Sequence, residues 1–240
     1  MENGILLAGS GEVDFQIHGL FSYNFFGTEV WITTSHACIL LVMLLILAFA
    51  IFANYKIRHA KEIPDTFQNI VELVVETLDK MIEGTMGLSH AKPFVNYIGT
   101  IFIFILLSNL SGLLGLRPPT ADYGTTLALA LITFFIITFQ KFKHKKPKGV
   151  IRDLMQPWPF WLPINLISDL AVPVSMSLRL FANVLSGVVI EALVYALLQQ
   201  VAIVWPAVLH AYFDIFSGAI QTYVFAMLSM TYISQAMDEE

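Results

Sequence analysis

Four ionisable residues lie within the two long apolar runs near the C-terminal end of this 240-residue sequence: Asp169, Arg179, Glu191 and Asp214. A charge at the centre of a bilayer costs about 2.5–3.5 kcal/mol on insertion scales, so such residues persist there only with a partner, a water-filled cavity or a function. Arg179 is the most informative of them, because a guanidinium stays charged when it is buried. These residues therefore point to a site that handles ions or binds an anion inside a membrane.

Helical spacing arranges the polar side chains of the two runs in two stripes. At about 100° per residue, Ser175, Asn183 and Ser186 lie within about 40° of Arg179. In the last run, taking Gln221 as origin, the residues within about 40° are His210, Asp214, Ser217 and Tyr232. Two polar stripes on neighbouring helices can line a wet path that neither could support in lipid. The spacing therefore predicts an ion path between these helices.

Several of these residues have a second interpretation. Asp169 lies about 80° from Arg179 and is a possible ion-pair partner for it. Glu191, about 120° away, is expected to face an aqueous vestibule or the outer interface. His210 is expected at the outer interface rather than in a relay, and Ser186 in a helix–helix contact.

Composition indicates a membrane protein. Hydrophobic residues make up 57% and charged residues 13%, whereas a soluble domain has about half apolar and about a quarter charged residues. The net charge of −5 argues against a nucleic-acid partner, and the single Cys38 excludes an intrachain disulfide and a cysteine metal site. No nucleotide-binding, hydrolase or metal-ligand motif occurs. We therefore expect no cofactor, no metal and no covalent chemistry by this chain alone.

The apolar runs predict an all-α polytopic membrane protein with five spanning helices and one interfacial amphipathic helix. Residues 1–31 are expected to form an extracytoplasmic leader and 32–240 a single membrane domain. Within it we expect a span at 32–54, an amphipathic helix at 64–88, a helical hairpin at 94–140 and a long helix pair at 163–236. The pair is too long for perpendicular spans, so strong tilt or bending at Pro173 is expected. The amphipathic helix could lie at the interface, against a partner, or as an ordinary solvated helix.

Charge distribution predicts the orientation. With five spans, nearly all the Lys and Arg residues outside them share one side, including the lysine-rich segment 141–148, which is expected to form a loop. That side should be cytoplasmic. The N-terminus is then outside and the C-terminus inside, and Asp122 is expected to cap a helix.

A family resemblance can be stated at this point. The segment from Ser175 to Asn183, SMSLRLFAN, followed by Gly187, closely resembles the signature of subunit a of the rotary F-type ATP synthases. The last helix resembles the same family through QTYVF, which begins at Gln221, and Tyr232. The hairpin does so through Asn109-Leu110 and residues 119–122.

The resemblance implies the stator subunit of a rotary ion motor in the bacterial inner membrane. The implied partners are a c-subunit ring, a b-subunit peripheral stalk and, indirectly, the peripheral F1 ATPase; the ion is H⁺ or Na⁺. Two offset half-channels would load and unload ions on ring carboxylates. Arg179 matches the essential coupling arginine, and the matches to the ion path are Asn183, Asp214, Gln221, Ser175, Asp169 and Tyr232. Val188 stands where some relatives carry Glu or His, so Asp214 is expected to handle the proton. The alternative is a secondary transporter that binds an anionic substrate through Arg179.

Overall fold

Five long apolar helices dominate the computed structural model, which describes residues 19–25, 28–58, 65–114, 118–155, 158–197, 208–209 and 211–237. The helices long and apolar enough to cross a membrane are α1 (Thr34–Arg58), α4 (Val95–Leu110, extended by the 3-10 turn η1, Ser111–Leu114), α5 (Tyr123–Leu154), α6 (Leu162–Leu197) and α8 (Gly218–Met237). The predicted all-α polytopic membrane fold with five spans is therefore confirmed. The shorter elements are α2 (Thr66–Met86), α3 (Leu88–Ala91), η2 (Pro119–Ala121), η3 (Pro159–Trp161) and the π-helical η4 (Ala211–Ser217).

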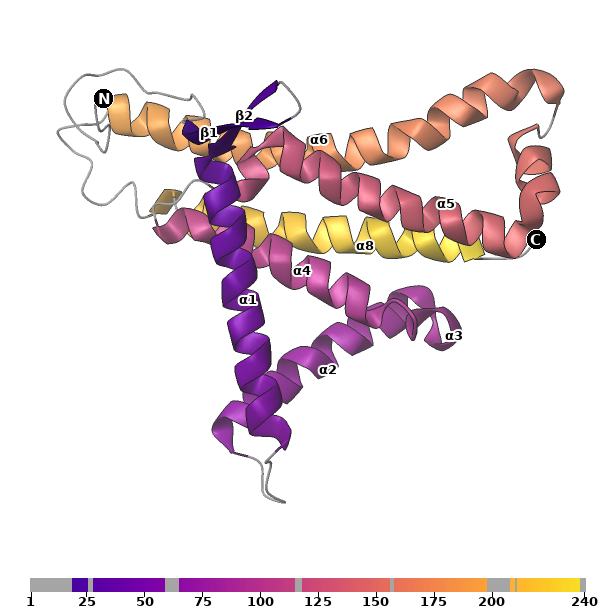
Figure 1. The fold of residues 1–240 in the computed structure, drawn as a ribbon. Helices are drawn as coiled ribbons and strands as arrows, with labels where there is room; N and C mark the ends of the chain where they lie inside the picture. Colours follow the sequence, from indigo (N-terminus) through magenta and orange to yellow (C-terminus); the bar gives the residue numbers. More distant parts are fainter. Residues whose placement is uncertain are drawn as a thin grey trace.

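Helices α5, α6 and α8 lie along one another and pack with α4, while α1 crosses this bundle steeply (Figure 1). Two clusters of buried side chains hold the bundle together. One joins α2, α4, α5 and α8 around Ile98 and Met230, and the other joins α4, α5, α6 and α8 around Ile105, Leu180 and Phe225. Helix α1 therefore lies at a steep angle to the long helices of the bundle.

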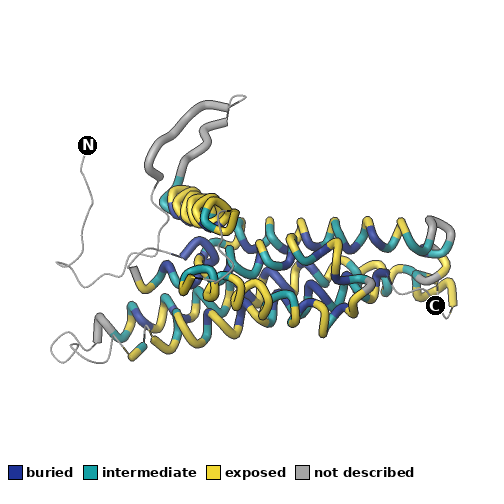
Figure 2. The backbone as a smooth tube through the Cα atoms, turned by 90° about the horizontal axis from the view of Figure 1, so that it is seen from below, coloured by how far each residue is buried: buried dark blue, intermediate teal, exposed yellow. Residues whose placement is uncertain are grey.

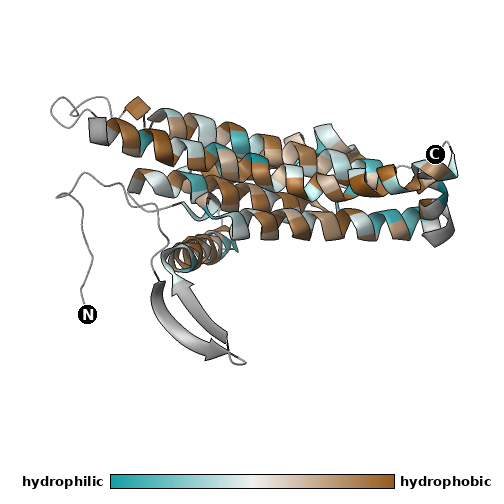
Figure 3. Ribbon diagram, turned by 90° about the horizontal axis from the view of Figure 1, so that it is seen from above, coloured by the Kyte–Doolittle hydropathy of each residue, from teal (hydrophilic) through white to brown (hydrophobic). Residues whose placement is uncertain are grey.

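Helix α1 contributes little to this core. It carries a nearly continuous apolar sequence, yet Leu40, Leu44 and Ile51 are all more than half exposed. Figure 2 shows α1 almost wholly exposed beside the bundle, and Figure 3 shows hydrophobic residues over much of the outer surface of the long helices. Apolar side chains that face outward are expected where the solvent is lipid.

The amphipathic helix forms as α2, with Asp65 as its N-cap: Asp65 Oδ1 accepts a hydrogen bond from the Thr66 amide at 2.9 Å. Its C-terminal end packs into the core through Ile82 and Met86. Its first half leaves Leu73 exposed. Helix α2 is therefore docked at one end and leaves an apolar side uncovered at the other.

Three features of the chain differ from the predictions. A two-stranded antiparallel hairpin, β1 (Gly19–Phe25) and β2 (Thr28–Thr33), precedes α1 where only a leader was expected; residues 1–18 lie outside the described part. Helix α5 continues to Leu154 through the lysine-rich segment 141–148, because lysine is a good helix former. The last helix begins with a π-helical turn.

Helix α6 is 36 residues long and contains Pro173. Proline lacks an amide hydrogen and clashes with the preceding turn, which bends a helix. Figure 1 shows α6 bent along its length. Pro173 itself is buried, so the bend keeps the helix against its neighbours.

Candidate functional site

Arg179 lies on the outer side of α6. The adjacent Met176 and Leu180 are buried against Ile105 and Phe225, and this packing turns the polar stripe away from the core. Arg179, Ser175 and Ser186 are all exposed. Among the described residues Arg179 forms no ion pair or hydrogen bond. The guanidinium is therefore presented outward from this chain, on a helix with apolar flanks.

Asp169 pairs with a residue that the sequence reading did not connect to it. Its Oδ2 atom lies 2.8 Å from Nζ of Lys141 on α5, and both side chains are about one-third exposed, at 39% and 34%. The alternative ion pair between Asp169 and Arg179 is therefore absent. The pair joins α5 to α6 near the basic end of α5.

The two predicted polar stripes meet at Asn183 and Ser217. Asn183 Nδ2 donates to Ser217 Oγ at 2.9 Å, and Ser217 Oγ lies 3.2 Å from Asn183 Oδ1. One turn further along α6, Gly187 packs closely on Phe213, where an added Cβ would be 3.3 Å from the ring. The absence of a side chain at Gly187 thus lets α6 and η4 approach.

Asp214 lies in η4, with its carboxyl group over Gly112 in η1. A Cβ added to Gly112 would lie 2.7 Å from Oδ1 and 2.9 Å from Oδ2 of Asp214. The carboxyl group therefore occupies space that any side chain at position 112 would fill. Turns of π type often occur at functional sites, and here one aims an acid across the bundle at the end of α4.

Asn109, close to Gly112, is the residue that links most of these elements. It is buried, and its Nδ2 atom donates to the Gly218 carbonyl at 3.0 Å and lies 3.3 Å from Thr222 Oγ1, while Oδ1 accepts from Thr120 Oγ1 at 2.7 Å. It thus ties α4 to the start of α8 and to the hairpin turn. The resemblance includes Asn109 and assigns it no role. An amide side chain next to Ser108, deep in an apolar run, is the signal that could have identified it.

The remaining predicted site residues differ in their surroundings. Gln221 is 7% exposed, and its Nε2 atom has no hydrogen-bond partner among the described residues. Tyr232 is half-buried and packs against both core clusters. Glu191 is only 8% exposed, so other residues of this chain cover it. His210 lies outside the described residues.

The helix cap at the hairpin is as predicted. Asp122 Oδ1 accepts a hydrogen bond from the Gly124 amide at 3.0 Å, which satisfies a free donor in the first turn of α5. Thr120, two residues earlier, is bonded to Asn109. The turn is therefore held to both helices of the hairpin.

Taken together, α6 and η4–α8 present an outward arginine with acids on either side of it in the sequence, Asp169 and Asp214. Ser175 lies between Asp169 and Arg179 on α6, and Asn183 bonds directly to η4. No group of His, Cys, Asp or Glu side chains within the described ranges could hold a metal ion. The arrangement therefore presents one fixed positive charge and two carboxyl groups that can attract or repel an ion.

Comparison with known proteins shows that the chain is similar to members of one family. The family model described as ATP synthase A chain matches residues 36–234. A relative from Propionigenium modestum, "ATP synthase subunit a, sodium ion specific", is 34% identical over 76% of this chain and 67% of its own length. "ATP synthase subunit a 1" of Chlorobium luteolum is 32% identical over 90% of this chain and 93% of its own. The chloroplastic subunit a of Stigeoclonium helveticum is 35% identical over 81% and 80%.

Proposed function

Because this multi-pass membrane protein belongs to the ATP synthase A chain family, we propose that it is the stator subunit that couples ion flow to rotation of a c-subunit ring. Arg179 is the coupling residue. The c ring, a b-subunit peripheral stalk and, indirectly, the peripheral ATPase are its partners. The translocated ion is H⁺ or Na⁺. Family membership sets aside the alternative of a secondary transporter.

The observation that carries this proposal is the exposure of Arg179 without a partner in the described part of its own chain. A guanidinium on a membrane-spanning helix requires an anion or water next to it. A carboxylate on a neighbouring ring subunit supplies that anion. The side of α6 about 100° away from Arg179 is packed into this chain's core through Leu180, which leaves the arginine side for the ring.

Two half-channels follow from the positions of the acids. Asp214, Asn183 and Gln221 belong to the outer half-channel, where η4 and α6 meet. Asp169 and Ser175 belong to the cytoplasmic one, and the Lys141–Asp169 pair lies near the basic end of α5. Asp169 precedes Arg179 by ten residues, about 15 Å along a helix. The two paths are therefore offset along α6, with Arg179 between them.

The physical consequence of this layout is obligatory rotation. The fixed positive charge favours the ionised form of a ring carboxylate beside it, since a nearby cation lowers a carboxyl pKa. A carboxylate that leaves Arg179 must take an ion before it enters lipid, because a bare charge there is costly. Each ion that falls through the potential releases about 2.3 kcal/mol per 100 mV, which is comparable with that cost.

The decisive experiment is Arg179→Ala in the assembled complex. We expect ATP-driven ion pumping in vesicles to be abolished while the complex still assembles. The matched control is Ser186→Ala on the same helix: Ser186 is exposed, and its hydroxyl donates to the Ala182 carbonyl of its own helix at 2.6 Å. This control should pump normally. Pumping retained in Arg179→Ala would rule the mechanism out.

A further inference from the structure

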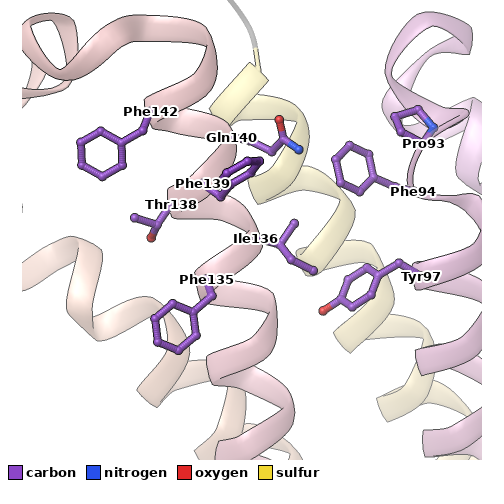
Figure 4. Close-up of a pocket in the computed structure, with 9 residues that line it drawn as sticks. All are labelled: Pro93, Phe94, Tyr97, Phe135, Ile136, Thr138, Phe139, Gln140 and Phe142. Atoms are coloured by element: carbon purple, nitrogen blue, oxygen red, sulfur yellow. The ribbon is translucent and has the colours of Figure 1, made fainter.

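An aromatic groove between α4 and α5 is not used by the ion path. It has a volume of about 660 Å³ and is lined chiefly by Pro93, Phe94 and Tyr97 at the start of α4 and by Phe135, Phe139 and Phe142 on α5. Figure 4 shows Phe94 and Tyr97 facing Ile136 and Gln140 across the space between the two helices. Phe135 and Phe139 are 68% and 65% exposed. The groove therefore opens outward, away from the bundle core.

The groove lies at one end of the two spans. Helix α4 begins at Val95, and the spanning part of α5 ends at Lys145. From Phe135 to Phe142 the helix rises about 10 Å, which matches the upper part of a lipid acyl chain rather than a whole membrane span. The open end of the groove is thus at the level where lipid head groups lie.

Positive charge surrounds that open end. Lys92 directly precedes Pro93, and Lys143 follows Phe139 by four residues, so it lies on the same side of α5 one turn further out. Both lysines are exposed, and neither takes part in an ion pair within the described residues. Lys141, by contrast, is paired with Asp169. The mouth of the groove therefore offers two cations to an anionic group.

One side chain that lines the groove carries a polar atom without a partner among the described residues. Gln140 is 9% exposed, and its Oε1 atom has no hydrogen-bond partner among the described residues. A buried acceptor without a donor is unfavourable. A hydroxyl group brought by a ligand would satisfy it once the Gln140 side chain turns toward the groove.

We propose that this groove binds an anionic phospholipid whose head group carries hydroxyls, such as phosphatidylglycerol. One acyl chain lies along Phe142, Phe139 and Phe135. The phosphate lies between Lys92 and Lys143, and a head-group hydroxyl donates to Gln140 Oε1. The charge of the two lysines selects this lipid over a zwitterionic one. The proposal goes beyond ion transfer and does not depend on the role of Arg179.

The test uses the assembled complex and a photoactivatable phosphatidylglycerol that carries a diazirine in one acyl chain, with the labelled peptides mapped by mass spectrometry. We expect label on both walls, at residues 93–97 and 135–142. Unlabelled phosphatidylglycerol should displace it and phosphatidylcholine should not. Lys92→Gln and Lys143→Gln should each weaken labelling about fivefold, since a juxtamembrane lysine contributes roughly that factor to binding of anionic lipid.

A groove-filling variant separates this site from the general lipid shell. Thr138 lines the groove, so Thr138→Trp should remove the label. Leu131→Trp is the matched control, because Leu131 is on the same helix, 38% exposed and not part of the groove lining. Equal displacement by phosphatidylcholine, or unchanged labelling in Thr138→Trp, would overturn the proposal. So would the absence of label from both walls, the result expected if a helix of another subunit covers the groove.

Discussion

At the scale of single residues, the charged side chains of the site differ in their surroundings. Some are paired or buried within the chain, and one is exposed on its surface. Asp169 is paired with Lys141 at 2.8 Å, and Glu191 is buried. Arg179 alone among the site's charged residues is exposed without a partner in the described part of the chain. In the proposed mechanism, a carboxylate on the ring supplies the counter-charge of Arg179.

The outer path should depend on Asp214 far more than on Glu191. Asp214 is half-buried in the same π-helical turn as Ser217, which contacts Asn183, whereas Glu191 is buried by its own chain. We therefore expect Asp214→Asn to slow passive ion flux through the membrane sector by about 10²-fold, the lower end of the 10²–10⁴-fold range of a lost proton-transfer group. Glu191→Gln serves as the paired variant and should change flux little. Equal effects on flux would show that the outer path is assigned wrongly.

Gly112 should determine where the Asp214 carboxyl group lies. A methyl group at this position would be 2.7 Å from Oδ1 of Asp214, so one of the two must move. A displacement of about 1 Å can slow a reaction about 10²-fold, and we expect Gly112→Ala to reduce ATP-driven pumping by about tenfold to a hundredfold. Gly99→Ala is the control, because no atom lies within 4 Å of the added carbon there. Normal pumping by Gly112→Ala would show that the carboxyl group is not held at this place.

At the scale of elements, α6 shows what helical periodicity can predict about the positions of side chains. A regular helix turns by a constant angle, so the stripe of Ser175, Arg179 and Ser186 could be placed on one side from spacing alone. The last helix obeys the same rule only after Gly218. Residues 211–217 form a π-helical turn with i→i+5 bonds, so the 100° step does not apply to Asp214. Its approach to Gly112 depends on tertiary packing, which spacing cannot reveal.

The contact between Asn183 and Ser217 should couple α6 to η4 energetically. Hydrogen bonds between membrane helices contribute about 0.6 kcal/mol on average and up to about 1.7. We expect Asn183→Ala and Ser217→Ala each to lower the temperature at which the complex dissociates, and the double variant to lower it by less than the sum of the two. Additive shifts, measured by thermal dissociation in one detergent, would indicate that the two side chains act independently.

At the scale of the whole molecule, the bundle has an apolar core and also turns many large apolar side chains outward. Composition alone predicted this class, because 57% hydrophobic residues cannot be enclosed by a chain of this size. The sequence analysis does not predict the hairpin β1–β2 or the continuation of α5 through its lysines. Both segments mix polar and apolar residues, so the hydrophobic pattern does not agree with the helix or strand propensity of their residues. The packing of α2 against the core through Ile82 and Met86 could not be predicted either, since an amphipathic pattern does not identify which element covers the apolar side of the helix.

The orientation of the whole molecule follows from its charges and can be measured directly. The basic end of α5 should be cytoplasmic, as positively charged residues near spans remain on that side. In a Cys38→Ser background, which lacks other cysteines, we expect Lys143→Cys to react with a membrane-impermeant maleimide in inverted vesicles and not in right-side-out ones. Leu113 is 45% exposed and follows the C-terminal end of α4, on the other side of the predicted spans from Lys143. Leu113→Cys should therefore react in right-side-out vesicles and not in inverted ones. Labelling of both positions from the same side would contradict the alternation of five spans, and exchange of the two patterns would place the N-terminus inside the cell.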